Sequence, residues 1–428
     1  MLYQTSKFAL ASQSAKGTAA TSNFVSGRMQ QHAMTPRFEV TDTAGEHIGS
    51  HSRSTALQST PIRTGHLVDI SFRQRLYPTM MGVALLGIGF TNTTSTTVIL
   101  TIAADSGTFT MTITGTGTVT TSALAFDIAA AAMETALELL TSVTSATVTG
   151  SAGGPFTITL DSSQTAAGMT ASAVSLTGGA STAVYSGWYY THVFTLPTAS
   201  SEGWITAYEY LGEVDGFDKI AKDARLSQMV FAADNTGIIL SGTGVGITDS
   251  DAAGSEALTT ESDYQISQAN GSFTMTSTDL TANTIGVPRG HTFTIDNPLD
   301  ETEQQLHSFG RATFSPTGKA FNGVMTGFQF SENAYSELVW GSASGTAPLI
   351  TIPEAQLTWS FQSPRYITGV IPYAATFDVA VAHINIQPYD ISAGGQILYD
   401  LNYEVVDQAA SAPVTITLQN DYATYAGS

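Results

Sequence analysis

Hydrophobic and polar residues alternate along much of the chain. Within residues 66–77 the apolar residues Val68, Ile70 and Phe72 are separated by polar ones. A period of two is typical of a β-strand that buries one face and leaves the other in water. The same texture returns in later stretches that begin at His291, Phe321, Ala355, Val379 and Gln396. The pattern predicts an all-β fold, mainly antiparallel, with few helices.

Two segments depart from this alternation and predict helices. Because proline is tolerated in a first helical turn, Pro78 allows a short apolar helix over residues 79–86. The apolar character of this helix is explained by packing in the core. A second helix is expected over residues 127–140, with Asp127 as its N-cap. Four apolar residues at helical spacing should face the core: Ile128, Ala132, Ala136 and Leu140.

The second helix lies in a segment, residues 93–182, in which roughly two residues in five are Ser or Thr. Apolar residues alternate with Thr on both sides of the helix, around Met111 and around Ile158. The segment therefore predicts a compact inserted module with strands flanking one helix. We expect Phe90 and Tyr185 to lie close together at its base.

A long hairpin is predicted from residues 225–233 and 238–247, with its turn at residues 234–237. Only Arg225 and Asp234 are charged within it, which favours an open sheet edge that pairs with a neighbouring subunit. We expect inter-subunit contacts at six positions: Arg73, Arg75, Arg225, Asp234, Asn235 and Gly237.

Three glycines alternate in the second strand of this hairpin, Gly242, Gly244 and Gly246. A nucleotide-binding turn would need a following helix and a Lys-Ser/Thr pair, which the sequence lacks. The glycines are therefore expected to allow another backbone to approach closely.

Composition adds that the surface is mostly uncharged. The chain has 428 residues, which suggests about two to four domains. Only 12% of the residues are charged, the net charge is −20, and there is no Cys. Neutral polar surfaces pack together at little desolvation cost, so the composition indicates self-association or secretion. Without Cys, disulfides, thiolate zinc sites and cysteine nucleophiles are excluded.

The sequence also argues against a membrane span and against nucleic-acid wrapping. The longest apolar run, residues 80–90, is about half the length needed to cross a bilayer. The N-terminus lacks the basic start and apolar core of a secretory signal. An acidic chain has few Lys and Arg side chains with which to bind phosphates.

Charge is unevenly distributed along the chain. Residues 1–75 carry eight basic and four acidic side chains, whereas residues 76–218 carry ten acids and no Lys or Arg. The N-terminal arm is therefore expected to dock on the acidic body of a neighbouring subunit through Arg63, Arg73 and Arg75.

Candidate metal ligands form no strong motif. His47 and His51 have a helical metal-ligand spacing, but Gly45 and Gly49 break any helix, which favours a polar loop. A calcium loop would use three acids, Asp249, Asp251 and Glu256, but its twelfth position is Thr260, which favours a solvated connector.

Candidate catalytic residues are equally weak. Three histidines, His192, His291 and His383, lie on strand patterns, where a hydrogen-bonded sheet histidine is commoner than a general base. Glu209 with Glu213 or Asp215 could form an acid pair for glycoside cleavage, but such a site needs a cleft between the carboxylates. No catalytic, cofactor or metal site is predicted, and the chain is not expected to be an enzyme.

Four stretches outside the module match a known family in their order along the chain and in their pattern of residue types. They are AKGTAA (15–20), ISFRQRLYPTMMGVALLGIGF (70–90), the block over 204–247 that contains YEYLGEVDGFDKIAKDARLSQMVF, and the block over 291–335 that contains HTFTIDNPLDE and GKAFNGVMTGFQF. Together they resemble the tail tube protein, or major tail protein, of long-tailed siphophages. The module is similar to an inserted repeat of phage structural proteins through its helix and SATVTGSAGGPFTITL (145–160).

The resemblance implies tube domains built as β-sandwiches or barrels with a packed short helix. Residues 1–65 would be an N-terminal arm, residues 66–92 with 183–260 a first tube domain, residues 93–182 a decoration module and residues 261–428 a second tube-like domain. It further implies a homo-oligomer of trimeric pseudo-hexameric rings, with hexameric rings as the alternative, stacked into a tube in the virion. DNA would pass through the lumen without specific binding, and a tape measure protein and tail-end proteins would be partners.

A second hypothesis stays open beside this one. The Thr-rich strands and aromatic residues are also compatible with a secreted or virion-surface β-sandwich, either an adhesin or a carbohydrate-binding module. Rings or tubes in electron micrographs would favour the first hypothesis, and saturable glycan binding by a stable monomer would favour the second.

Overall fold

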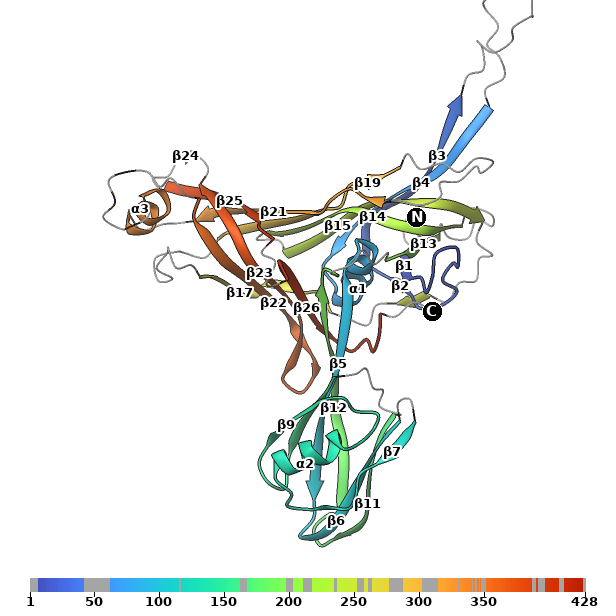
Figure 1. Cartoon of the computed structure of the whole chain (residues 1–428), viewed down its shortest axis with the longest axis vertical. Helices are drawn as coiled ribbons and strands as arrows, with labels where there is room; N and C mark the ends of the chain where they lie inside the picture. Colours follow the sequence, from blue (N-terminus) through green and yellow to red (C-terminus); the bar gives the residue numbers. More distant parts are fainter. Residues whose placement is uncertain are drawn as a thin grey trace, which may run out of the picture.

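The fold is mainly antiparallel β, as the alternation predicts. The computed structural model describes residues 7–41, 62–114, 117–161, 168–197, 203–210, 218–234, 237–251, 258–260, 264–276, 288–301, 315–328, 332–340, 342, 345, 347, 352–386, 390–391, 397–407 and 412–425. A two-layered body carries a smaller module, which hangs from it on a narrow neck (Figure 1).

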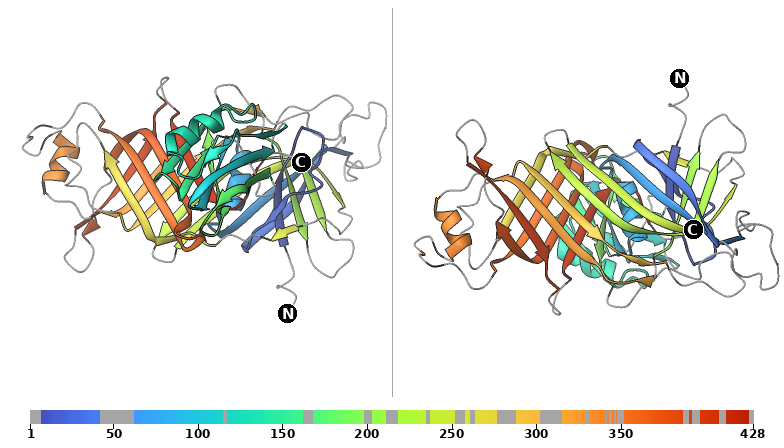
Figure 2. Two further views of the ribbon diagram at one scale, coloured as in Figure 1. Left: turned by 90° about the horizontal axis from the view of Figure 1, so that it is seen from below. Right: turned by 90° about the horizontal axis from the view of Figure 1, so that it is seen from above.

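One layer of the body is a broad antiparallel sheet, which we call the upper sheet because it lies at the top in Figure 1. Its neighbouring strands are β3 (Met29–Thr41), β4 (Ile62–Arg75), β15 (Gly237–Asp251), β14 (Lys219–Asp234), β18 (Gly290–Asp296), β21 (Ala320–Phe328), β25 (Ile397–Val405) and part of β23 (Ile371–Ile386). Figure 2 shows these strands side by side when the body is seen from above.

The other layer, the lower sheet, lies between the upper sheet and the module. Its strand order is β17 (Ser267–Thr276), β22 (Glu354–Thr368), β23, β26 (Val414–Asn420), β12 (Thr182–Thr195) and β5 (Thr91–Ala103). Strand β23 belongs to both layers, because residues 374–379 pair with β26 and residues 382–386 pair with β25. The two sheets are therefore joined along this strand.

Aromatic side chains fill the space between the layers. Phe231 of the upper sheet packs edge-on against Phe377 of the lower sheet, with ring centroids 5.0 Å apart. Phe293 lies 6.0 Å from Phe377 and 6.4 Å from Trp359. One continuous buried cluster includes residues from both predicted tube domains. Among the described residues, no separate core marks off a second tube domain.

Helix α1 (Pro78–Gly87) lies within the body, and the predicted apolar helix is confirmed. Every residue of α1 except Leu86 is buried, because the segment is apolar on all sides. Tyr425, near the C-terminus, packs on this helix at Gly82: a Cβ atom there would lie 2.2 Å from the tyrosine Cζ. Glycine is therefore the residue that fits beneath the ring.

Short elements complete the body. Strands β13 (Ile205–Tyr210), β1 (Lys7–Ser12), β2 (Phe24–Ser26) and β16 (Leu258–Thr260) extend the sheet from the N-terminal half of β14. The remaining elements are β19 (Leu299–Asp300), β20 (Ser315–Pro316), β24 (Asp390–Ile391) and α3 (Glu332–Trp340).

The module has a core of its own, distinct from that of the body. In one sheet, β9 (Ala146–Gly150) and β10 (Phe156–Leu160) extend the far ends of β5 and β12. The second sheet contains β6 (Ser106–Thr114), β7 (Thr118–Thr120), β8 (Leu124–Ala125) and β11 (Met169–Thr177). Helix α2 (Ala130–Glu138) packs against β9.

Helix α2 differs from its prediction in two respects. Its N-cap is Ala129, with no side-chain cap, so the prediction that Asp127 caps the helix is wrong. The buried residues within the helix are Met133 and Leu137, whereas Ala132 of the predicted stripe is exposed. Leu140 is buried just beyond the helix, and Ile128 and Ala136 pack against the core of the module, so the predicted stripe is confirmed in part.

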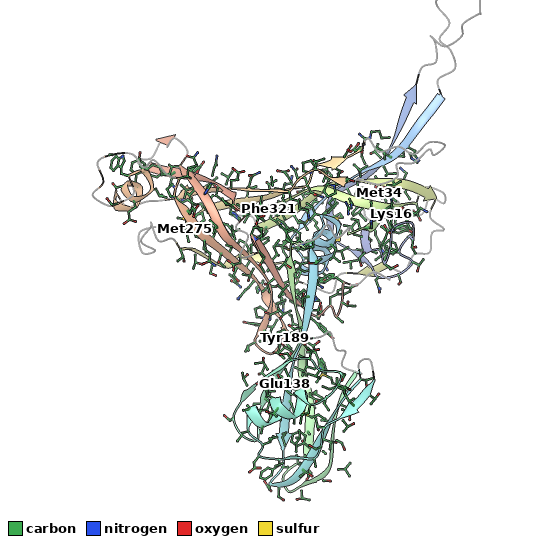
Figure 3. The ribbon with its side chains drawn as sticks, in the orientation of Figure 1. Lys16, Met34, Glu138, Tyr189, Met275 and Phe321 are labelled. Carbon is green, nitrogen blue, oxygen red and sulfur yellow. The ribbon has the colours of Figure 1, made fainter. Side chains whose placement is uncertain are left out.

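The base of the module also differs from its prediction. Thr91, next to Phe90, pairs with Thr195, whereas Tyr185 pairs with Leu100 farther along the same ribbon. Phe90 and Tyr185 therefore do not lie opposite each other, because β5 and β12 pass through the neck without ending there. Figure 3 places Tyr189 at the neck, beside a register shift between Ser186 and Tyr189.

Candidate functional site on the upper sheet

The outer face of the upper sheet is a wide surface of mostly neutral side chains. Residues directly opposite one another on paired strands share a face, so the strand register defines rows across the sheet. One row crosses nine strands and contains Gln31, Arg73, Ser241, Val230, Thr294, Asn322, Glu404, His383 and Glu354. Its members are half-buried or exposed, as expected for a face that meets solvent.

Part of this face is hollowed over strands β18, β21, β25 and β23. The hollow has a volume of about 370 Å³. Eight of its lining residues fall in two adjacent rows of the sheet: Thr294, Asn322, Glu404 and His383 in one, and Thr292, Val324, Asn402 and Asn385 in the other. The exposed Ile352 also lines it. The hollow is therefore rich in hydroxyl and carboxamide groups.

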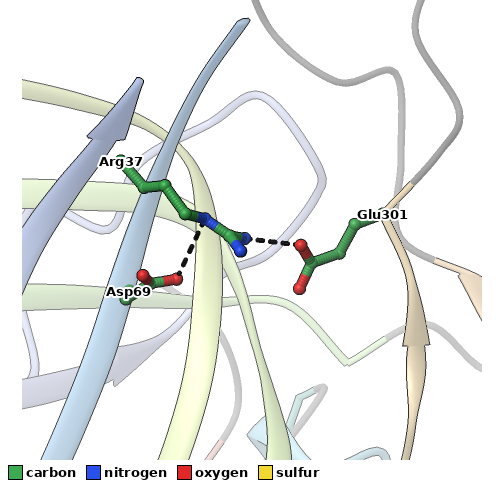
Figure 4. Close-up of polar contacts among 3 residues, drawn as sticks. All are labelled: Arg37, Asp69 and Glu301. Carbon is green, nitrogen blue, oxygen red and sulfur yellow. Dashed lines mark hydrogen bonds and ion pairs between the residues drawn. The ribbon is translucent and has the colours of Figure 1, made fainter. Parts of the chain in front are cut away.

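An ion-paired arginine fixes the base of the β3–β4 hairpin to the body. The Arg37 guanidinium lies 3.5 Å from the Asp69 carboxylate of β4 and forms a second ion pair with Glu301, which follows β19 (Figure 4). Exposed ion pairs contribute little to stability. The two carboxylates approach from different elements, however, so they orient the guanidinium at the point where the hairpin leaves the body.

The predicted open edge of the β14–β15 hairpin is wrong. Strand β14 pairs with β15 on one side, and on the other with β13 along its N-terminal half and with β18 along its C-terminal half. Strand β15 pairs with β4. The hairpin is thus interior to the upper sheet, because strands from distant parts of the sequence cover both of its edges.

The six predicted contact residues do not form one site. Arg225 is 4% exposed, and its guanidinium carbon lies 4.4 Å from the ring centroid of Trp204, so it has no surface to offer a neighbouring subunit. Arg75 lies beside Gly237, since a Cβ atom on this glycine would be 2.6 Å from an arginine nitrogen. Arg73 is exposed on the outer face.

The hairpin tip is only partly described. Asp234 pairs with Gly237, as the predicted turn requires. The side chain of Asp234 and the whole of Asn235 lie outside the described residues. A role of Arg73, Arg75 and Gly237 in subunit contacts stays a prediction.

The expected close backbone approach is confirmed at Gly244 of β15, whereas Gly242 makes room for a side chain. A Cβ atom on Gly244 would lie 2.3 Å from the carbonyl oxygen of Arg225, and one on Gly242 would lie 2.5 Å from the Phe72 ring. Gly246 is less crowded, because its Cβ atom would lie 3.2 Å from that of Ala221. The absence of side chains at these positions therefore allows other parts of the same chain to pack closely against β15.

His192 is a buried, hydrogen-bonded sheet histidine, as predicted. Its Nε2 donates to the carbonyl oxygen of Tyr422 at 2.8 Å, and its Nδ1 lies 2.9 Å from the Thr94 hydroxyl. Burial lowers the pKa of His192 to about 4, although the hydrogen bonds to Tyr422 and Asn420 oppose this shift. The ring is therefore neutral near pH 7.

His291 is likewise buried, and His383 is not. The Nε2 atom of His291 lies 2.8 Å from the Tyr403 hydroxyl, its ring stacks on Trp359, and burial lowers its pKa to about 3. His383 lies at the surface with its Nε2 3.2 Å from a Glu354 oxygen. Among the described residues, neither His291 nor His383 lies beside a group of side chains arranged for catalysis.

The other candidate chemistry finds no support among the described residues. Burial raises the pKa of Glu209, whose carboxylate lies 3.6 Å from the His32 ring nitrogen. Its predicted partners lie outside the described residues, as do His47, His51 and Glu256, and the side chains of Asp249 and Asp251 are not described either. Within the described ranges no group of three or more His, Asp or Glu could hold a metal ion.

The sequence did not reveal the hollow. Its carboxamides come from Asn322, Asn385 and Asn402, which are far apart in the chain and carry no motif. The alternation places each on the polar face of its own strand. Only the strand order brings them together, and no local pattern in the sequence reveals that order.

Comparisons with known proteins leave the family open. None of the described helices is long and apolar enough to cross a membrane. No protein-family model matches the chain, and no curated protein matches its sequence.

Proposed function

We propose that the chain is a structural virion subunit that assembles into stacked rings and forms a phage tail tube. The proposal combines the sequence resemblance with the arrangement of the body. In such a tube the outer face of the upper sheet would line the channel. The protein would act by assembly and not by catalysis.

The observation that carries this proposal is the placement of the module. The upper sheet and the module lie on opposite sides of the body, separated by the lower sheet (Figure 1). If the upper sheet faces the channel, the module projects outward and leaves the channel open. This arrangement suits a decoration module on the outside of a tube.

The side chains of the upper sheet suit a channel wall for DNA. Neutral residues prevail in the row across the sheet, Glu354 and Glu404 lie at one end of it, and Arg73, towards the other end, is its one Lys or Arg. Such a wall offers few cations to phosphates, and its carboxylates repel them, so DNA would pass without docking. A tape measure protein and tail-end proteins are further partners of the proposed tube, and trimeric pseudo-hexameric rings are its preferred form.

The β3–β4 hairpin suits a contact between successive rings. It rises from the body at the end opposite α3 (Figure 1), and Arg37 anchors its base. Arg73 lies at the other end of β4 from the hairpin tip, where β4 pairs with β15, and adds an exposed positive charge to the outer face beside the base of the hairpin. In the proposed tube these cations face the acidic body of a neighbouring subunit.

Charge reversal tests this contact. We expect the double variant Arg73→Glu, Arg75→Glu to assemble less than the unmodified chain, measured by light scattering at about 0.1 M salt, where exposed charges interact within roughly 10 Å. Arg365→Glu, at an exposed site on the lower sheet, is the matched control and should assemble normally. Equal assembly and equal salt dependence in all three proteins would contradict the proposed contact.

A further inference from the structure

The polar groups in the hollow have unused hydrogen-bonding capacity. The side chains of Asn322, Asn402 and Asn385 make no hydrogen bond to any described part of the chain, and neither do those of Thr292 and Thr294. They are half-buried or exposed, so a ligand can reach them. Five neutral polar side chains thus converge on one concave surface without satisfying one another.

The chemistry of these groups selects the kind of ligand. Each carboxamide and each hydroxyl can both donate and accept a hydrogen bond. The hydroxyl groups of a sugar have the same dual capacity. Neighbouring strands lie about 4.8 Å apart, and alternate residues of a strand about 6.7 Å apart. The two rows therefore spread their groups over about 14 by 7 Å, an area suited to two linked sugar rings.

The size, apolar surface and charge of the hollow further restrict the kinds of ligand that fit it. Its volume of about 370 Å³ lies in the range of small-molecule sites. Val324 and the 56% exposed Ile352 offer apolar surface to the C–H groups of a sugar ring. Among the described residues that line the hollow, Glu404 is the one carboxylate, and it disfavours anionic ligands such as phosphorylated or sulfated sugars.

We propose that this hollow is a binding site for a short neutral saccharide. The site lies in the body, away from the Thr-rich module, on the face that the tube proposal assigns to the channel wall, and it uses residues that this proposal does not require for subunit contacts. It binds without cleaving, because hydrolysis of a glycosidic bond needs two carboxyl groups on either side of that bond. The inference holds for the isolated chain and for an assembled form in which this face stays accessible.

Ligand-observed nuclear magnetic resonance on the full chain tests the proposal. The probes are maltose, cellobiose, lactose and N,N′-diacetylchitobiose, each titrated to about 10 mM, ten times the roughly 1 mM dissociation constant expected of a shallow polar site. We expect saturable binding of at least one disaccharide. Glucose 6-phosphate should not bind, because Glu404 repels its phosphate.

Two variants locate the binding. The double variant Asn322→Ala, Asn402→Ala should lower the affinity for the saccharide by about tenfold, since each substitution removes neutral hydrogen bonds. Asn270→Ala, at an exposed position of β17 in the lower sheet, is the matched control and should bind like the unmodified chain.

Either of two results would overturn the proposal. One is that none of the four disaccharides binds to the folded chain. The other is equal affinity in the double variant, which would place the binding elsewhere. Electron micrographs of the same samples report assembly separately, so the failure of the saccharide site and the failure of the tube proposal are distinguishable.

Discussion

Tyr425 ties the C-terminal segment to the core, and its substitution tests this account of the body. The side chain is 1% exposed. Its hydroxyl donates to the Pro78 carbonyl oxygen at 3.1 Å and accepts from the Asn420 amide at 2.7 Å. Its ring lies 4.5 Å from that of His192, in an edge-to-face arrangement. One residue therefore joins α1, β12 and β26.

Two substitutions separate the hydroxyl from the ring. Tyr425→Phe removes both hydrogen bonds. The Pro78 carbonyl keeps its bond within α1, whereas the buried Asn420 amide loses a partner, so we expect a loss of about 2 kcal/mol. Tyr425→Ala also removes the ring, and the loss rises to about 5 kcal/mol, since truncating a buried aromatic residue costs about 3 to 5 kcal/mol.

Equilibrium denaturation in urea measures these losses through the shift in midpoint. Tyr366→Phe is the matched control, because Tyr366 is 59% exposed, and its stability should change by less than about 0.5 kcal/mol. A Tyr425→Phe variant with an unchanged midpoint would refute the reasoning, since it would mean that the hydroxyl is not desolvated in the folded chain.

Three further predictions follow from the packing, the buried histidines and the neck. Gly244→Ala should lose about 2 kcal/mol in urea denaturation, because its Cβ atom would meet the Arg225 backbone at 2.3 Å. Gly117→Ala, with nothing within 4 Å, should be neutral. The pKa values of His192 and His291 lie below the ordinary value of 6.5, at about 4 and about 3, so the unfolded chain binds protons first as the pH falls. Stability should therefore fall from pH 6.5 towards these values and be fully present above 6.5, and His192→Gln should flatten this slope; an unchanged slope would contradict it. Replacing residues 97–189 with Asn-Gly, which closes the paired Thr96 and Tyr190, should leave the body folded and assembling in electron micrographs; a folded body that no longer assembles would place the module in the subunit contacts.

Local patterns in the sequence predicted individual strands well. Val68, Ile70 and Phe72 of β4 are all buried, as their alternation requires. Leu67, on the opposite face, is buried too, because Trp204 and Val245 cover it. A period of two identifies the face of each residue, but it does not show which distant segments cover that face.

The sequence was less informative about how the elements fit together. The β14–β15 hairpin resembles an open edge because it has few charges, but the same composition suits the interior of a sheet, where β13, β18 and β4 pair with it. The N-cap of α2 was missed because Ala129 takes the extended backbone conformation of a cap without a capping side chain. The hollow depends on strand order and has no local signal.

Negative-stain electron microscopy of the purified full chain tests the central claim most directly. The proposed function predicts rings of uniform diameter and, at high protein concentration, stacks or tubes with small projections on the outside, since the module lies opposite the upper sheet. A chain that stays a monodisperse monomer at every concentration and salt condition would contradict the claim that it is a tube subunit.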